Sequence, residues 1–92
     1  MLNAIVMINC AVDSIPEVAQ KVADLDGVEQ VFSVTGDVDL IALVRVGEYD
    51  DLAVTVADSI AKVPGITTLR THLAFRAYSR SDLEEAFQLG LD

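Results

Sequence analysis

Basic side chains are scarce in this sequence, which has 6 lysines and arginines against 15 aspartates and glutamates. The formal net charge is therefore -9, and the sequence pI is about 4.2. A surface with this charge repels a phosphate backbone and an anionic membrane alike. The composition argues against direct binding of DNA or RNA and against attachment to a membrane.

Long apolar runs and paired cysteines are also missing. The longest uninterrupted apolar runs, residues 4–8 and 40–44, are far shorter than a helix that spans a bilayer. The first basic residue is Lys21, so the start of the chain lacks the basic region of a signal peptide. Cys10 is the single cysteine, which excludes an internal disulfide and fits a reducing compartment. We therefore expect a cytoplasmic protein.

Residues for metal or catalytic chemistry are equally sparse. His72 and Cys10 are single and fall on different predicted strands. No His-x-x-x-His or Cys-x-x-Cys pair and no glycine-rich phosphate loop occurs. The serines lie beside predicted turns or helix ends, where capping explains them. We expect no metal site, no catalytic residue and no cofactor, and therefore not an enzyme.

The 92 residues suffice for one domain. Their apolar residues recur with the period of a strand in some segments and with the period of a helix in others. Strands are predicted at residues 3–10, 28–34, 39–46 and 66–77, and helices at about 14–27 and 50–62. In residues 28–34, the alternation predicts one face with Val28, Phe32 and Val34.

The helix predictions depend on caps and on apolar stripes. Ser14 and Glu17 form a capping-box pattern at the start of the first helix, and Pro64-Gly65 stops the second. The stripe of the first helix is Ile15, Val18, Ala19, Val22 and Leu25. The stripe predicted for the second is Ala53, Val56, Ala57 and Ile60.

The order of these elements is a repeat. ADLDGV ends the first helix and AKVPGI ends the second, which places two β-α-β units in series. A hairpin through TGDVDL, residues 35–40, joins the units. The prediction for residues 1–78 is an α+β, ferredoxin-like βαββαβ domain with a four-stranded antiparallel sheet and both helices on one face. Residues 79–92 are predicted to form an amphipathic helical tail.

The sheet face that the helices leave bare is also apolar, because the first and third strands carry apolar residues on both faces. Such a patch is unusual in a monomer, so we expect a homodimer in which two sheets pack face to face. The alternative is that the tail covers the patch, with its apolar residues Leu83, Ala86, Phe87 and Leu91.

The hairpin TGDVDL has two interpretations. Gly36 can adopt a positive φ and expose its backbone groups, while Asp39 projects from the start of a rigid strand. Such a turn can hold a small zwitterion, with Asp39 paired to its ammonium group. In the other interpretation, Asp37 or Asp39 only caps the turn by accepting backbone hydrogen bonds.

Residues 2–78 follow one order of elements and motifs: strand, helix, (D/P)-G-(V/I), alternating strand, TGDxDL, central strand, helix, VPGI and LRTHLAF. This order resembles the ligand-binding domain of the leucine-responsive regulator and AsnC (Lrp/AsnC) family, also called the RAM domain. The resemblance implies dimers that assemble further, into octamers or similar discs, and that bind amino acids between dimers. It implies ligand contacts at Gly36, Asp39, Thr71, His72, Leu73 and Ala74. Thr71 and His72 could equally serve sheet packing alone.

Family members typically carry a helix-turn-helix before this domain, and this sequence starts directly at the first strand. The resemblance therefore implies a stand-alone effector domain that senses an amino acid and co-assembles with a DNA-binding Lrp/AsnC-type regulator. Two alternatives remain open: a small dimeric α+β barrel enzyme of the monooxygenase type, and a structural assembly partner without ligand binding.

Overall fold

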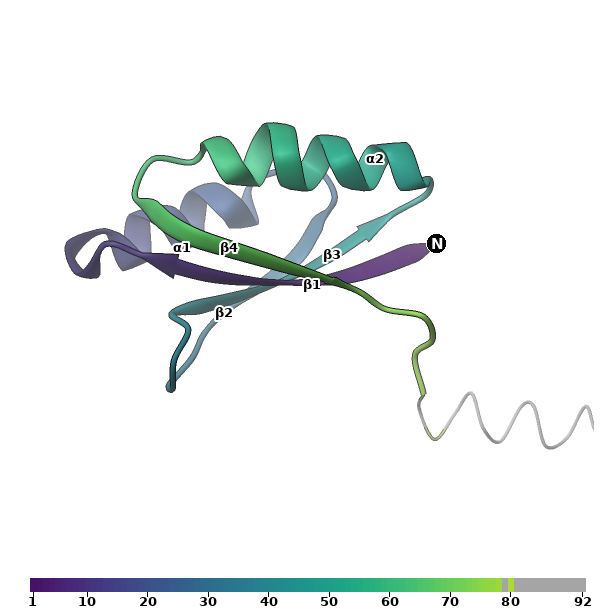
Figure 1. Cartoon of the computed structure of the whole chain (residues 1–92), viewed down its shortest axis with the longest axis horizontal. Coiled ribbons are helices and arrows are strands. Elements are labelled where there is room, and N and C mark those ends of the chain that lie inside the picture. The colour runs from purple at the N-terminus through teal and green to yellow at the C-terminus, as the bar shows by residue number, and fades with distance from the viewer. Residues whose placement is uncertain (79, 81–92) are drawn as a thin grey trace, which may run out of the picture.

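The protein folds as two β-α-β units that share one antiparallel sheet, and a computed structural model describes residues 1–78 and residue 80. The strands are β1 (Leu2–Cys10), β2 (Val28–Ser33), β3 (Leu40–Val46) and β4 (Ile66–Leu73), in the sheet order β2-β3-β1-β4. The helices are α1 (Ile15–Ala23), after a 3-10 turn η1 (Val12–Ser14), and α2 (Tyr49–Ala53), which continues through η2 (Val54–Ser59) and η3 (Ile60–Lys62). Both helices lie on one side of the sheet (Figure 1). The predicted ferredoxin-like βαββαβ fold is confirmed.

The core lies between this sheet and the helices, and it follows from alternation in the two central strands. Every second residue of β1 and β3 faces the helices and is buried, whereas the residues between them are more exposed. Val18 and Val22 of α1 pack against this layer and are fully buried, as the predicted apolar stripe requires. The helix-facing residues of the two strands are Ala4, Val6, Ile8, Cys10, Leu40, Ala42, Val44 and Val46.

The apolar stripe predicted for the second helix is wrong in part. Ala53 and Ala57 are exposed, whereas Leu52, Thr55 and Ile60 are buried. The reason is the π-helical winding of Val54–Ser59, whose i→i+5 bonds change the positions that share a face. Ile60 therefore follows Thr55 on the buried side, five positions later.

The alternation predicted for β2 is also wrong. The pairing with β3 shifts between Val28 and Gln30, so that Val28 and Val31 pack against the core. Phe32 lies on the opposite face of the sheet, opposite Ile41, and is 42% exposed. An irregularity of this kind inserts one residue and reverses the side to which all later residues point.

Two predicted element ends also differ from the structure. The capping box at Ser14 does not form, because Ser14 ends the η1 turn and its hydroxyl hydrogen-bonds to Asp13 Oδ1 at 3.3 Å. β4 ends at Leu73, and one further bond, from the Ala74 N–H to the Asn3 carbonyl, follows it. The tail predicted for residues 79–92 lies outside the described residues, apart from residue 80.

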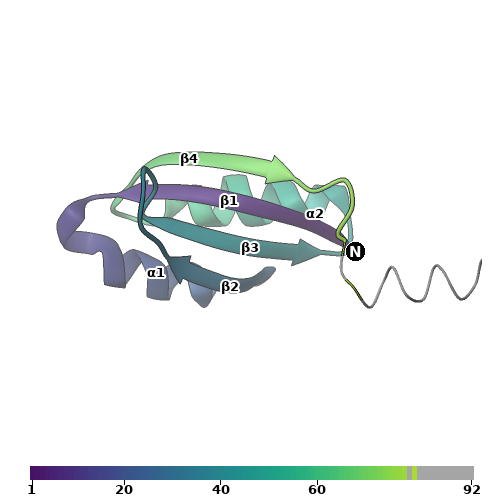
Figure 2. The same ribbon diagram turned by 90° about the horizontal axis from the view of Figure 1, so that it is seen from below.

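The sheet face opposite the helices carries an apolar patch, which we call the open face: Ile5, Met7, Phe32, Ile41 and Leu43. These residues pair across β1, β2 and β3, and directly opposite residues of antiparallel strands project to the same side. In the view from below, no helix lies in front of the sheet, and only the loop between β2 and β3 crosses in front of β3 and β1, near one end (Figure 2). Ile5 and Phe32 are 40% and 42% exposed, respectively.

Three glycines with positive φ make the turns: Gly27 (89°), Gly36 (110°) and Gly65 (100°). Gly27 and Gly65 end the two repeat units in tight packing. A Cβ on Gly27 would lie 2.7 Å from Thr55 Oγ1, whereas a Cβ on Gly36 would meet nothing within 4 Å. The two turns therefore require glycine for different reasons.

We predict that Gly36→Ala lowers the free energy of unfolding by about 1 to 3 kcal/mol, because only the backbone conformation is strained. Gly27→Ala has the same backbone strain and in addition a collision with Thr55, so it should lower the free energy of unfolding by more. Urea unfolding of both variants at one protein concentration measures the difference. Equal losses in the two variants would contradict the close packing of Gly27.

Candidate functional site

The hairpin between β2 and β3 presents Gly36 at an open tip. The Val34 N–H donates to the Asp39 carbonyl at 3.1 Å and closes the loop. Val38 is 5% exposed, so the loop buries one apolar side chain of its own. Gly36, at a φ of 110°, has only free space where a side chain would stand. The backbone N–H and C=O of the tip are thus accessible to a ligand.

Asp39 ties this hairpin to the end of β1. Its Oδ2 accepts a hydrogen bond from the Cys10 N–H at 2.9 Å. Its own N–H donates to the Ile8 carbonyl at 3.0 Å and to Asn9 Oδ1 at 3.2 Å. The pairing of β1 with β4 shifts between Asn9 and Cys10, so the Cys10 N–H is bonded by a carboxylate at a break in the strand register. Asp39 therefore has a structural role whatever else it does.

The same contact affects the Cys10 side chain. Cys10 is 6% exposed, and burial, together with the negative charge of Asp39, raises the pKa of its thiol. Both causes disfavour the thiolate. Cys10 is thus a buried core residue near the candidate site, and its thiol is less reactive than that of an exposed cysteine.

The predicted ligand residues of β4 lie on both faces of the sheet. Thr71 pairs with Val6, on the side of the helices, and His72 pairs with Ile5, on the open face. Leu73 pairs with Ala4, and Ala74 bonds to Asn3. The first three are exposed and Ala74 is half-buried.

The structure does not bring the six predicted residues together in one copy of the chain. Asp39 lies level with Asn9 of β1, whereas Thr71 and Ala74 lie level with Val6 and Asn3. Three to six strand residues separate these levels, which is about 10 to 20 Å at the rise of an extended chain. β1 itself also lies between β3 and β4. Gly36 and Asp39 form one group, and Thr71, His72, Leu73 and Ala74 form another.

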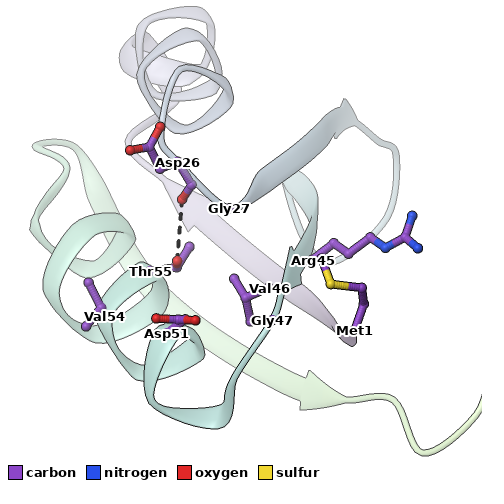
Figure 3. A pocket seen from close by; sticks show the side chains of 9 residues that line it. All are labelled: Met1, Asp26, Gly27, Arg45, Val46, Gly47, Asp51, Val54 and Thr55. Atoms are coloured by element: carbon purple, nitrogen blue, oxygen red, sulfur yellow. Dashed lines mark hydrogen bonds between the residues drawn. The ribbon is translucent and has the colours of Figure 1, made fainter.

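A cavity of about 350 Å³ lies elsewhere, at the corner between β3, the turn after α1 and the second helical segment (Figure 3). We call it the corner cavity. None of its lining residues is among the ligand-binding residues predicted from the sequence. The lining residues are Met1, Asp26, Gly27, Arg45, Val46, Gly47, Asp51, Val54 and Thr55.

Residues 1–78 and 80 contain no group of three or more His, Cys, Asp or Glu side chains that could hold a metal ion. None of the helices described is long and apolar enough to cross a membrane.

Comparisons with known proteins identify relatives of the whole described domain. The family model of the Lrp/AsnC ligand binding domain matches residues 3–83. The HTH-type transcriptional regulator LysM of Saccharolobus solfataricus is 30% identical over 78 residues, which are 84% of this chain and 54% of that protein. The chain thus spans about half the length of this relative.

Solved structures show the same fold. TTHA0845 from Thermus thermophilus is 38% identical with a TM-score of 0.82, and the match covers 87% of this chain and 100% of that one. The hypothetical protein PHS023 from Pyrococcus horikoshii is 26% identical with a TM-score of 0.77, covering 87% and 96%. AsnC of E. coli, at 18% identity and a TM-score of 0.79, covers 85% and 53% and shares the fold.

The bond between Asp39 and Cys10 predicts a stability effect. Asp39→Ala leaves the part-buried Cys10 N–H without its acceptor, and we expect it to lower the free energy of unfolding by about 1 to 3 kcal/mol. Asp37→Ala, in the same loop, removes an exposed carboxylate and should change the free energy of unfolding by less than about 0.5 kcal/mol. Asp39→Asn keeps an acceptor oxygen, so its effect on the free energy of unfolding should fall between those of the two alanine variants. Urea unfolding measures all three, and equal values for the two alanine variants would refute a structural role of Asp39.

The raised pKa of Cys10 predicts a loss of stability at alkaline pH. The folded protein retains the thiol proton at pH values where the unfolded chain, with the ordinary pKa of 9.0, has lost it. The stabilisation is complete below that value and is lost as the pH rises through the folded-state pKa. The free energies of unfolding of the protein and of Cys10→Ala, compared from about pH 7 to about pH 10.5, isolate this effect. A difference between the two proteins that stays constant across this range would contradict it.

Proposed function

The chain belongs to the family of Lrp/AsnC ligand-binding domains, and from this membership we propose that it binds a small amino acid and couples that binding to the association of its copies. Its relative LysM is a transcriptional regulator. Regulator NMB0573 of Neisseria meningitidis, 17% identical with a TM-score of 0.75, was solved as a complex with L-Met. An amino acid is therefore the ligand class to test first.

The hairpin tip is the observation that carries this proposal. Gly36 offers a backbone N–H and C=O in open space, which suit the α-carboxylate and α-ammonium of an amino acid. One oxygen of Asp39 is bonded to Cys10, and no hydrogen bond among the described residues engages its Oδ1. That oxygen can form a charge-assisted hydrogen bond with the ammonium group.

The distance between the two groups of predicted residues leads to the second half of the proposal. The hairpin of one copy and residues 71–74 of another copy together line the site, since one copy holds them about 10 to 20 Å apart. A ligand that bridges two copies binds the assembly better than the separate chains. Ligand binding therefore shifts the equilibrium towards assembly by the difference of the two affinities.

The open face supports association in the first place. Burying Ile5, Phe32 and their neighbours against the same patch of a second copy removes apolar surface from water. A two-fold axis pairs one patch with itself, which is the commonest symmetry of soluble oligomers. The proposed unit is a homodimer through the open face, with ligand between dimers in an octamer or similar assembly.

The proposed role in the cell is indirect control of transcription. With a net charge of -9, the chain is poorly suited to contact DNA itself. A DNA-binding Lrp/AsnC-type regulator with the same domain is the proposed partner, in the cytoplasm. Co-assembly would then connect the amino-acid concentration to the regulator, without any catalysis by this chain.

One observation favours a second candidate function, an assembly partner without a ligand. The carboxylate of Asp39 already has a structural partner in Cys10, which accounts for the aspartate without a ligand. Gly36, in turn, is explained by the positive φ of the hairpin alone.

A thermal-shift series against each L-amino acid at millimolar concentration separates the two candidates. A ligand at about 100 times its dissociation constant stabilises the folded form by about 2.7 kcal/mol, so we expect a clear rise of Tm for one or a few amino acids. Sedimentation velocity with the same ligands should show a larger assembly. A flat panel, with unchanged sedimentation, would support the assembly partner and contradict sensing.

His72→Ala is the variant for this experiment, because His72 is exposed and its loss should leave the fold intact. We expect it to abolish the shift given by the active amino acid. Gln20→Ala, at an exposed position of α1 on the other side of the sheet, is the control and should retain the shift.

A further inference from the structure

We propose that the predicted tail, residues 79–92, docks on the open face of its own copy and competes there with a second copy of the chain. The proposed function assigns the open face to a homodimer, so this inference rests on that function and names what regulates its dimer contact. From its sequence, the tail is predicted to form an amphipathic helix. Residues 84–92 lie beyond the residues that match the family model.

The chain reaches the edge of the open face immediately before the tail begins. Residues 74–78 follow β4, and the Ala74 N–H donates to the Asn3 carbonyl at 2.9 Å. From there the chain descends on the side of the sheet opposite the helices (Figure 1). Part of this segment lines a groove of about 280 Å³ together with Ile5 and Leu43 of the open face. The tail therefore starts next to the apolar patch that it is proposed to cover.

The tail also matches the open face in length and in its apolar residues. Residues 81–89 precede Gly90 and make a helix of about 14 Å, whereas the seven residues of β3 extend over about 23 Å. The loop between β2 and β3 crosses only the end of the face that lies away from residues 74–78 (Figure 2). Leu83 and Phe87, on the apolar stripe of the helix, can therefore lie on the patch and remove it from water.

The open face has basic side chains at its margins, although the chain as a whole is acidic. The strand registers place Arg45 of β3 and Arg70 of β4 on the same side of the sheet as the open face, and Arg76 lines the groove. These are three of the six lysines and arginines in a chain of net charge -9. Glu29 pairs with Arg45 at 4.0 Å, and no ion pair among the described residues engages Arg70 or Arg76.

The tail supplies the opposite charge beside its apolar stripe. Asp82 and Glu84 adjoin Leu83 in the sequence, so in a helix they lie about 100° to either side of it. Arg70 lies on the edge strand β4, and Arg45 lies on β3, two strands away, so a cation stands on each side of the patch. Exposed ion pairs contribute little energy, and these pairs mainly orient the tail on the apolar surface.

The short connection favours the open face of the same copy. Only Tyr78 lies between the lining of the groove and the tail, so the tail meets its own open face at an effective concentration of about 1 mM. An intrinsic dissociation constant of about 0.5 mM then keeps the tail docked about two thirds of the time. Dimerisation requires a free open face on both copies, so it is weakened about tenfold.

A nitroxide label on the tail tests the contact itself. Gln88→Cys, outside the apolar stripe, carries the label in a Cys10→Ala background, and amide NMR spectra are recorded on dilute protein. We expect the strongest broadening at Ile5 and Leu43 and the weakest at Gln20 of α1, on the other side of the sheet. Labelled protein mixed with isotope-enriched protein that has no label should cause no broadening. Broadening in this mixture would place the tail on a second copy and would overturn the proposal.

Sedimentation equilibrium of matched variants tests the competition. Leu83→Ser removes an apolar residue of the stripe and should lower the dissociation constant of the dimer about tenfold, since most copies are then open. Leu89→Ser makes the same change outside the stripe and should leave it unchanged. Glu84→Gln should also lower it, whereas Glu85→Gln, on the polar side of the helix, should not. The core of the described residues lies before residue 70, so all four variants keep the fold.

The inference and the proposed function fail in different ways. The inference is overturned if broadening is equal on both sides of the sheet, or if Leu83→Ser does not lower the dissociation constant of the dimer. A higher dissociation constant would show that the tail holds two copies together. If neither the protein nor any variant associates, the homodimer fails and the competition with it, and the label still decides whether the tail docks on its own copy.

Discussion

Two helices cover only one face of a four-stranded sheet, and in this protein the central strands are apolar on both. That constraint governs the molecule. The helix-facing residues of β1 and β3 form a complete core with α1 and the second helical segment. The residues between them form the open face, where Ile5 and Phe32 remain 40% and 42% exposed. The family membership and the bare face together are the basis for proposing that the chain acts as an assembly.

The second feature with wide consequences is the link between Asp39 and Cys10. It fixes the hairpin on the end of β1, so the open tip at Gly36 is held by a rigid base. The same aspartate thus belongs to the fold and to the proposed site. Its loss affects stability, and a test of ligand binding is cleaner at His72, which is exposed on the opposite side of β1.

Most of the fold could be predicted from the sequence, because periodicity and turn residues are local signals. The repeat of strand, helix and glycine predicted the correct element order, and the stripe with Val18 and Val22 is buried as predicted. The errors fall where winding or register changes. The π-helical turns at Val54–Ser59 bury Thr55, and the irregularity after Val28 exposes Phe32. Neither has a signature in the letters of the sequence.

The candidate site was less predictable than the fold, for a physical reason. The partner of Asp39 is a backbone N–H that lies 29 positions away in the sequence, and any residue type could supply it. The corner cavity likewise combines residues from three separate elements. The resemblance placed six residues in one site, whereas the geometry places them in two groups. The two groups can line one site if they belong to different copies of the chain.

Subunit mixing tests that assignment most directly. Asp39→Asn and His72→Ala are prepared separately and then unfolded and refolded together, and binding of the active amino acid is measured by calorimetry. If each site combines the hairpin of one copy with residues 71–74 of another, the mixture regains a fraction of intact sites that neither variant has alone. Binding that stays absent in mixed assemblies would place both groups in the same copy and would contradict the assignment.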